Sequence, residues 1–452
     1  MNTPICDFVR AYAAGNPARM HMPGHKGKPL IGPEALDLTE IAGADVLYRS
    51  RGIIRQSEEN AASLFGTART VYSAEGSSLC IRAMLYLALL TAKEKGIPAR
   101  LLAGRNAHRT LMTAAALLDL EVEWLLPAPG EDILSCAVTA ETLENRLKEK
   151  PYMAVYLTSP DYLGRQADLR AAAEACRRAG VPLLVDNAHG AYLKFLAEDA
   201  HPMTLGADAC CDSAHKTLSC LTGAAYLHLS ENAPEGWAER AEQAVSLFAS
   251  TSPSYLILQS LDRMNAELAG GWPEKLRRAE GCLAGMKKTL RQEGWTLIGD
   301  EPVKLALDAA ARGYTGEELQ EILRRDGIEC EFADREYLVL MPSADTPEED
   351  WNRLEAALRE IPGREPLTGK PPALPVPERV TGIRAAMLSP RETLSPEKAV
   401  GRILADACVS CPPAVPVVIA GERVTEDAAA CMAYYGVKEC EVTVNTENGR
   451  PV

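Results

Sequence analysis

Between residues 60 and 230 the sequence alternates between two kinds of segment. Short apolar, β-branched runs are followed by Ala- and Leu-rich stretches with the amphipathic spacing of helices. This alternation is typical of βαβ units around a mostly parallel sheet, so it predicts an α/β fold. Seven runs are expected to be strands: 70–73, 100–103, 122–126, 153–158, 182–186, 209–213 and 224–229. The expected helices include 78–95, 107–118, 139–150 and 168–179.

We expect the chain to be organised in five parts. A second α/β pattern has expected helices near 273–293 and 347–360 and expected strands near 303–306 and 337–341. Prolines then become frequent, which favours an extended linker. The predicted parts are an N-terminal arm (1–50), a large domain (51–265), a small α/β domain (266–362), a Pro-rich linker (363–378) and a C-terminal domain (379–452).

Charge and cysteine content narrow the class of protein. The net charge is -14, from 48 basic and 62 acidic residues, which argues against a nucleic-acid-binding protein. The 13 cysteines are scattered, and the single CxxC (408–411) has no second pair, so reduced thiols are expected. No apolar run approaches the ~20 residues of a membrane span. The N-terminus has no secretory pattern, so we expect a cytoplasmic protein without membrane contact.

The first expected strand leads into a possible phosphate site. Gly76, Ser77 and Ser78 directly precede the long expected helix. Ligands of an open parallel sheet bind at the carboxyl ends of its strands. Glycine allows close backbone approach, serine offers hydroxyls, and a helix N-terminus presents free N–H groups to an anion. Serines that only cap the helix remain the simpler alternative.

Two further polar groups follow expected strands. His108 comes after the second strand, where its ring could stack on a flat cofactor or lie at the surface as a capping residue. Asp186 follows five apolar residues, and a buried carboxylate needs a partner. A pyridinium nitrogen, a helix N-terminus and a metal ion all remain open as that partner. His189 is a second functional group or a loop histidine.

Lys216 is the fourth group at this edge. It follows a strand of small residues and precedes a mostly apolar stretch, and lysine is costly to bury. Desolvation lowers the pKa of a lysine and favours chemistry on carbonyl groups. A lysine that reaches back to the surface is the alternative for any single position. Here, however, it completes an ordered series of phosphate site, ring, acid and lysine.

Several longer motifs carry a family resemblance. They lie at 21–27 (HMPGHKG), 37–40, 65–66, 105–108, 158–162, 186–190 (DNAHG), 213–218 (SAHKTL), 251–255, 411–416 and 421–422. With them the chain resembles the fold-type I pyridoxal 5′-phosphate (PLP) enzymes and, among these, the ornithine/lysine/arginine decarboxylase family. The resemblance covers most of 20–265 and again about 383–440. It implies a mostly parallel seven-stranded sheet in the large domain.

The resemblance also implies roles for single residues. Lys216 would form a Schiff base with PLP, His108 would stack on the pyridine ring, and Asp186 would pair with the ring nitrogen. His189 would lie near the phenolic oxygen of the cofactor or the substrate carboxylate. The phosphate would be bound by Gly76, Ser77, Ser78, Ser213 and His215, joined by Thr251 and Ser252 from a neighbouring subunit. A homodimer with shared active sites is therefore expected, and higher oligomers are not excluded.

The expected function is PLP-dependent decarboxylation of arginine, lysine or ornithine to the corresponding di- or polyamine. An aminotransferase or lyase on the same fold and a non-catalytic regulatory homologue are the alternatives. Another hypothesis is a metal site at His21 and His25 with Asp186 and His189. The Met-Pro-Gly between the two histidines disfavours the helix that would align them, so we expect no metal. Departures from the family pattern at 46, 74–75, 109, 411 and 414 concern the choice of substrate.

Overall fold

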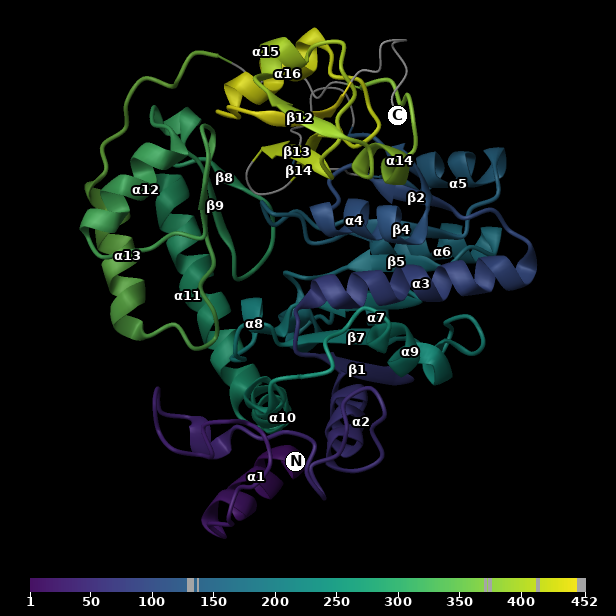
Figure 1. Ribbon diagram of the computed structural model, residues 1–452. Helices are drawn as coiled ribbons and strands as arrows, with labels where there is room; N and C mark the ends of the chain where they lie inside the picture. The colour runs from purple at the N-terminus through teal and green to yellow at the C-terminus, as the bar shows by residue number, and fades with distance from the viewer. Residues whose placement is uncertain (128–133, 136–137, 370–371, 373–375, 412–414, 445–452) are drawn as a thin grey trace.

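A seven-stranded sheet forms the centre of the molecule in the computed structural model, which describes residues 1–127, 134–135, 138–369, 372, 376–411 and 415–444 (Figure 1). The strand order is β1-β7-β6-β5-β4-β2-β3. The strands are β1 (Arg69–Ser73), β2 (Arg100–Gly104), β3 (Glu121–Leu125), β4 (Ala154–Thr158), β5 (Leu183–Asp186), β6 (Ala209–Asp212) and β7 (Ala225–Leu229). Neighbours from β3 to β6 pair in parallel, whereas β7 is antiparallel to both β1 and β6. The predicted mostly parallel α/β sheet is confirmed.

Helices cover both faces of this sheet, which explains why central strands such as β4 and β5 are mostly apolar. On one face lie α3 (Ser77–Lys95) and α4 (Arg109–Leu118), and on the other lie α5 (Ala140–Glu149) and α6 (Leu169–Ala179). Along β4, Tyr156 packs into the first core, while Val155 and Leu157 pack into the second. The prediction placed the start of the second helix at 107. The helix begins at Arg109 instead, because His108 caps it.

A smaller four-stranded sheet lies beside the large one (Figure 1). Its order is β10-β11-β9-β8, with β8 (Leu297–Ile298), β9 (Leu305–Asp308), β10 (Phe332–Ala333) and β11 (Tyr337–Leu340). The helices α11 (Trp272–Gln292), α12 (Gly316–Arg325) and α13 (Glu348–Glu360) pack around it. The prediction missed β8 and β10, since two residues carry no periodicity. It also missed α12, although its capping box of Thr315 and Glu318 is a recognisable start signal.

The two ends of the chain form further structure. The expected N-terminal arm contains α1 (Pro4–Ala14), which packs against α2 (Ile53–Phe65) and α10 (Tyr255–Leu268). The C-terminal part has two strand pairs, β12 (Arg391–Leu394) with β15 (Cys440–Thr443) and β13 (Cys408–Cys411) with β14 (Val415–Ile419). It also has α14 (Ile383–Met387), α15 (Pro396–Ala399) and α16 (Glu426–Tyr434). Parts of the expected linker (370–371, 373–375) and of the 411–416 motif (412–414) lie outside the described residues.

No helix in the described segments is both long enough and apolar enough to cross a lipid bilayer.

Candidate active site

A cavity of about 450 Å³ opens at the carboxyl ends of β4, β5 and β6, beside the start of α3. This is where ligands bind in open α/β sheets. The structure brings most of the predicted site residues to its walls, namely Gly76, Ser77, Ser78, His108, Asp186, His189, Ser213, His215 and Lys216. Asn106, Thr158, Asp161 and Tyr162 also line it. Residues that are more than 100 positions apart in the sequence therefore face one space.

One end of the cavity has the features of an anion site. Gly76 has φ +75°, a conformation that residues with a Cβ rarely adopt, and a Cβ there would point into open space. Helix α3 begins at the next residue, so its free N–H groups are directed at this end. The Ser213 hydroxyl donates to Ser77 Oγ at 2.8 Å. His215 is fixed beside them by its Nδ1, which donates to the Ala224 carbonyl at 2.9 Å.

His108 combines the two roles that the sequence left open. Its Nδ1 accepts a hydrogen bond from the Thr110 backbone N–H at 3.3 Å, so it caps α4, and its exposed ring lines the cavity. Because Nδ1 is an acceptor, the neutral ring carries its proton on Nε2. The Thr110 hydroxyl lies 2.9 Å from His108 Nδ1 and 3.1 Å from Ser78 Oγ. These contacts join the ring to the anion end of the cavity.

Asp186 lies at the end of β5 and is 3% exposed. The Tyr156 hydroxyl donates to its Oδ2 at 3.0 Å, and the Ala188 backbone N–H donates to its Oδ1 at 3.2 Å. The Cys211 thiol lies 3.6 Å from Oδ1. These neutral donors stabilise a negative charge and fix the direction of the carboxylate.

Lys216 and His189 meet within the cavity. Lys216 Nζ lies 2.9 Å from His189 Nε2. Burial lowers the pKa of His189 well below its ordinary value, and the charges of Lys304 and Lys216 lower it further. His189 is therefore neutral and can accept a hydrogen bond from Lys216. In the described part of the chain, His189 Nδ1 has no hydrogen-bond partner.

The expectation of a buried Lys216 needs correction, because its side chain is exposed and lines the open cavity. It belongs to a short helix, α8 (Ala214–Thr217), directly after β6. The surrounding protein still removes enough water to lower the pKa of its amine, while the charge of Asp186 acts in the opposite direction. A lowered pKa increases the fraction of free amine, which is the nucleophilic form.

The sequence analysis also missed an acidic group that contacts the cavity wall from outside the lining residues. Glu331, just before β10 in the small sheet, accepts a hydrogen bond from the Tyr162 hydroxyl at 2.8 Å. Tyr162 lines the cavity and packs edge-on against His189, with ring centroids 5.0 Å apart. The charge of Glu331, like that of Asp186, partly opposes the lowering of the Lys216 pKa. No motif marks Glu331, which lies 115 positions after Lys216 and reaches the site only because the two sheets pack together.

Two predicted residues do not reach this cavity. Thr251 and Ser252 are exposed and are absent from the residues that line it. Their segment is held nearby, because the Ser250 backbone N–H donates to Glu75 Oε1 at 2.7 Å and Glu75 lines the cavity. His21 and His25, which the sequence analysis considered and disfavoured as metal ligands, contact Tyr12 and Asp37, respectively.

The C-terminal part of the chain contacts the segment that carries His108. Arg105, at the end of β2, forms a two-pronged ion pair with Glu422 at 2.7 and 2.9 Å. Both side chains are buried, and Arg105 also donates to the Val417 carbonyl. Two parallel hydrogen bonds between a guanidinium and a carboxylate fix both the distance between the two groups and their relative orientation. The backbone three residues before His108 is thus anchored from outside the large domain.

Comparisons with known proteins agree with this arrangement. A family model described as Orn/Lys/Arg decarboxylase, major domain, matches residues 3–295, and the C-terminal domain of the same family matches residues 381–442. An arginine decarboxylase of Bacillus subtilis (strain 168) is 29% identical over 460 residues, covering 94% of this chain and 92% of that protein. The uncharacterized protein YaaO of the same organism is 29% identical over 462 residues, covering 95% and 93%.

Solved structures share the fold. The constitutive lysine decarboxylase of E. coli superimposes with a TM-score of 0.77 at 18% identity, covering 99% of this chain and 81% of that one. The lysine decarboxylase of Francisella novicida gives a TM-score of 0.78 at 16% identity, covering 99% and 80%. The fold is that of the fold-type I PLP-dependent enzymes. The chain belongs to the Orn/Lys/Arg decarboxylase family, as its motifs indicated, and is an amino acid decarboxylase.

Membership of this family implies PLP as the cofactor, and the cavity can be tested for its fit to that group. PLP presents a phosphate, an aldehyde and a basic ring nitrogen. The cavity offers an anion end where Gly76 leaves room for the backbone to approach, an amine on Lys216 and a carboxylate on Asp186. The donor set therefore fits the three reactive parts of PLP.

Proposed function

We propose that this protein decarboxylates a basic amino acid, namely arginine, lysine or ornithine, to the corresponding amine with PLP bound in the cavity. The family description names these three amino acids, and a B. subtilis relative is an arginine decarboxylase. The observation that carries the substrate class is the carboxylate of Glu331, linked to the cavity wall through Tyr162. A negative group at this position can pair with the cationic end of such a substrate.

Different residues at the cavity would bind different parts of the cofactor. Lys216 Nζ would hold the aldehyde carbon covalently, His108 would face the ring, and Asp186 would keep the ring nitrogen protonated. The phosphate would bind at the start of α3, to Gly76, Ser77, Ser78, Ser213 and His215. When bound, PLP supplies an electron sink for the electrons of the Cα–carboxylate bond.

The chain's own groups prepare this chemistry. Tyr156 and Ala188 hold the Asp186 carboxylate at a fixed angle, so its charge is directed at one place in the cavity. Neutral His189 accepts from Lys216 Nζ and orients the amine. In the overall reaction the bond between Cα and the carboxylate breaks, carbon dioxide leaves, and Cα gains a proton.

Direct assays would test this proposal. The purified protein should show the visible absorbance of PLP bound to lysine and should release carbon dioxide from at least one of arginine, lysine and ornithine. An aminotransferase would instead consume a keto acid and release no carbon dioxide. Transfer of the amino group without carbon dioxide release would overturn the decarboxylase proposal. A protein without bound PLP would favour a regulatory homologue.

Exchange of Glu331 for glutamine tests the substrate class. The amide keeps the size and can still accept from Tyr162 but loses the charge that would pair with the substrate cation. We expect KM for the preferred basic amino acid to rise about tenfold with a smaller change in kcat, as for a lost charge-assisted hydrogen bond to substrate. Glu329→Gln is a matched control, because Glu329 is exposed and pairs with Arg324. Equal KM values for the two variants would remove Glu331 from substrate binding.

We also propose a cytoplasmic homodimer with shared active sites. Thr251 and Ser252 are exposed and outside their own cavity, as residues that serve a neighbouring subunit would be. Apolar side chains after α1 are also largely exposed, including Leu30 at 87% and Ile31 at 84%. Exposed apolar groups that cluster along one segment favour an interface.

A further inference from the structure

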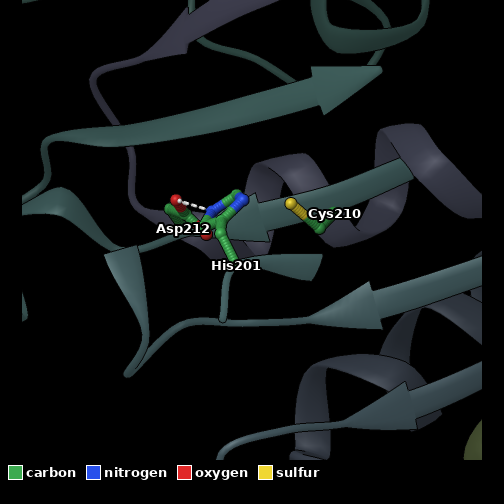
Figure 2. A group of neighbouring side chains, drawn as sticks. All are labelled: His201, Cys210 and Asp212. Atoms are coloured by element: carbon green, nitrogen blue, oxygen red, sulfur yellow. Dashed lines mark hydrogen bonds and ion pairs between the residues drawn. The ribbon is translucent and has the colours of Figure 1, made fainter. Parts of the chain in front are cut away.

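A second cluster of polar side chains lies at β6, outside the residues that line the cavity. His201, Cys210 and Asp212 lie close together there, and all three are fully buried (Figure 2). Cys210 and Asp212 are two residues apart on β6 and so share one face of the sheet, while His201 precedes the short helix α7 (Pro202–Leu205). His201 Nε2 lies 2.9 Å from Asp212 Oδ2.

Asp212 is a buried anion with two imidazole neighbours. His228, on β7, places its Nε2 3.3 Å from the same Oδ2. Burial alone would raise the pKa of Asp212, but His201 and His228 outweigh that effect and hold the pKa below its usual range. His201 Nδ1 accepts from the Met203 backbone N–H at 3.4 Å, so Nε2 carries a proton, which is directed at Asp212.

The other oxygen of Asp212 connects this cluster to the cavity. Asn187 Nδ2 donates to Asp212 Oδ1 at 2.7 Å. The Asn187 backbone also forms two hydrogen bonds, donating to Cys211 O at 3.0 Å and accepting from Gly190 N at 2.8 Å. A Cβ at Gly190 would overlap the Asn187 amide, so that side chain fills the inside of the turn 187–190. This turn begins directly after Asp186 and contains His189.

We propose that Asp212 is a positioning residue for the cofactor site: its carboxylate orients Asn187, which fixes the turn that places Asp186 and His189 in the cavity. This inference rests on the proposed binding of PLP there. Asp212 also directly precedes Ser213, whose hydroxyl binds Ser77 at the anion end. One buried carboxylate thus links the two strand ends that carry the acid and the lysine.

The same donors could instead coordinate a metal ion, since their ligand atoms lie within 4.8 Å of one another. Two features favour the hydrogen-bonded arrangement. The nitrogen of His201 that faces Asp212 carries a proton, whereas a metal needs a bare nitrogen. Burial also raises the pKa of the Cys210 thiol well above its ordinary value, whereas a cysteine ligand must be a thiolate.

Titration of the apoprotein with PLP, in the absence of substrate, tests the proposal. We expect Asp212→Asn and Asn187→Ala each to weaken PLP binding about tenfold, and the double variant to lose no more than either single one, as for two members of one contact. Asp208→Asn is the matched control. Asp208 precedes the other end of β6, where its Oδ2 accepts from Leu183 N at 2.7 Å, and its loss should leave PLP affinity unchanged.

Several outcomes would overturn the proposal. Additive losses in the double variant would show that the two residues act separately. A lower melting temperature of Asp212→Asn with unchanged PLP affinity would show a purely structural role. One zinc ion per chain that is lost in Cys210→Ser, without loss of PLP affinity, would assign the cluster to a metal. If Asp212→Asn does not fold, Gly190→Ala displaces Asn187 with Asp212 intact, and it must weaken PLP binding similarly. Failure to act on basic amino acids would leave these PLP titrations unaffected.

Discussion

Lys216→Ala is expected to abolish decarboxylation and the visible absorbance of protein-bound PLP. Among the described residues that line the cavity, Lys216 alone carries an amine, so no neighbour can take its place. Its amine is also prepared by its surroundings, because the nearby protein removes water from the amine and so lowers its pKa, and His189 accepts from it at 2.9 Å. We expect kcat to fall by about a thousandfold or more, the scale seen when a covalent catalytic group is removed.

Activity and folding of the Lys216→Ala variant should both be measured, so that a chemical defect can be told apart from unfolding. Lys275→Ala is a suitable control, since Lys275 forms an exposed ion pair with Asp345 outside the cavity and should keep full activity. The alanine variant at 216 should keep its circular dichroism spectrum and melt cooperatively. Undiminished carbon dioxide release from a folded Lys216→Ala protein would remove this lysine from the mechanism.

The central sheet could be predicted from the sequence because its physical cause is local. Strands covered by helices on both faces must be apolar at nearly every position, and this leaves short unbroken runs such as 181–185. The site residues could be predicted for a related reason. Groups that follow parallel strands meet at one edge, so His108, Asp186 and Lys216 converge without any knowledge of side-chain packing.

Contacts between separate parts of the chain could not be predicted in this way. Glu331 contacts Tyr162 of the cavity wall through the packing of the small sheet, and Glu422 reaches Arg105 through the packing of the C-terminal part. Glu331 sits in no pattern that separates it from a solvated surface acid, and the 421–422 motif that contains Glu422 does not indicate its partner. Asp212 is a similar case, because its role depends on His201 and His228, which come from different elements. Such partners are set by tertiary structure and carry no periodic signal.

Asp186→Ala is expected to separate catalysis from folding. The carboxylate is 3% exposed and is held by neutral donors from Tyr156 and Ala188, so no ion pair with a described residue is lost when it is removed. Removing the carboxylate also removes the cost of burying its charge, and this offsets much of the cost of leaving the Tyr156 and Ala188 donors unpaired. We therefore expect the free energy of unfolding to change by only ~1–2 kcal/mol. The ring nitrogen of PLP, in contrast, would lose its proposed counter-charge. We expect weaker PLP binding and a kcat reduced about a hundredfold or more.

A helix-capping residue provides a control variant that should lose stability without losing activity. Asp168 caps α6 by accepting from the Ala171 backbone N–H at 3.0 Å and is not among the described residues that line the cavity. Asp168→Ala should cost about 1 kcal/mol of stability and leave kcat and PLP affinity unchanged. Asp186→Ala should show the reverse pattern, a small loss of stability with a large loss of rate. Wild-type kinetics in Asp186→Ala would contradict this role. The ring nitrogen would then have another partner, and Asp186 would serve only the structure.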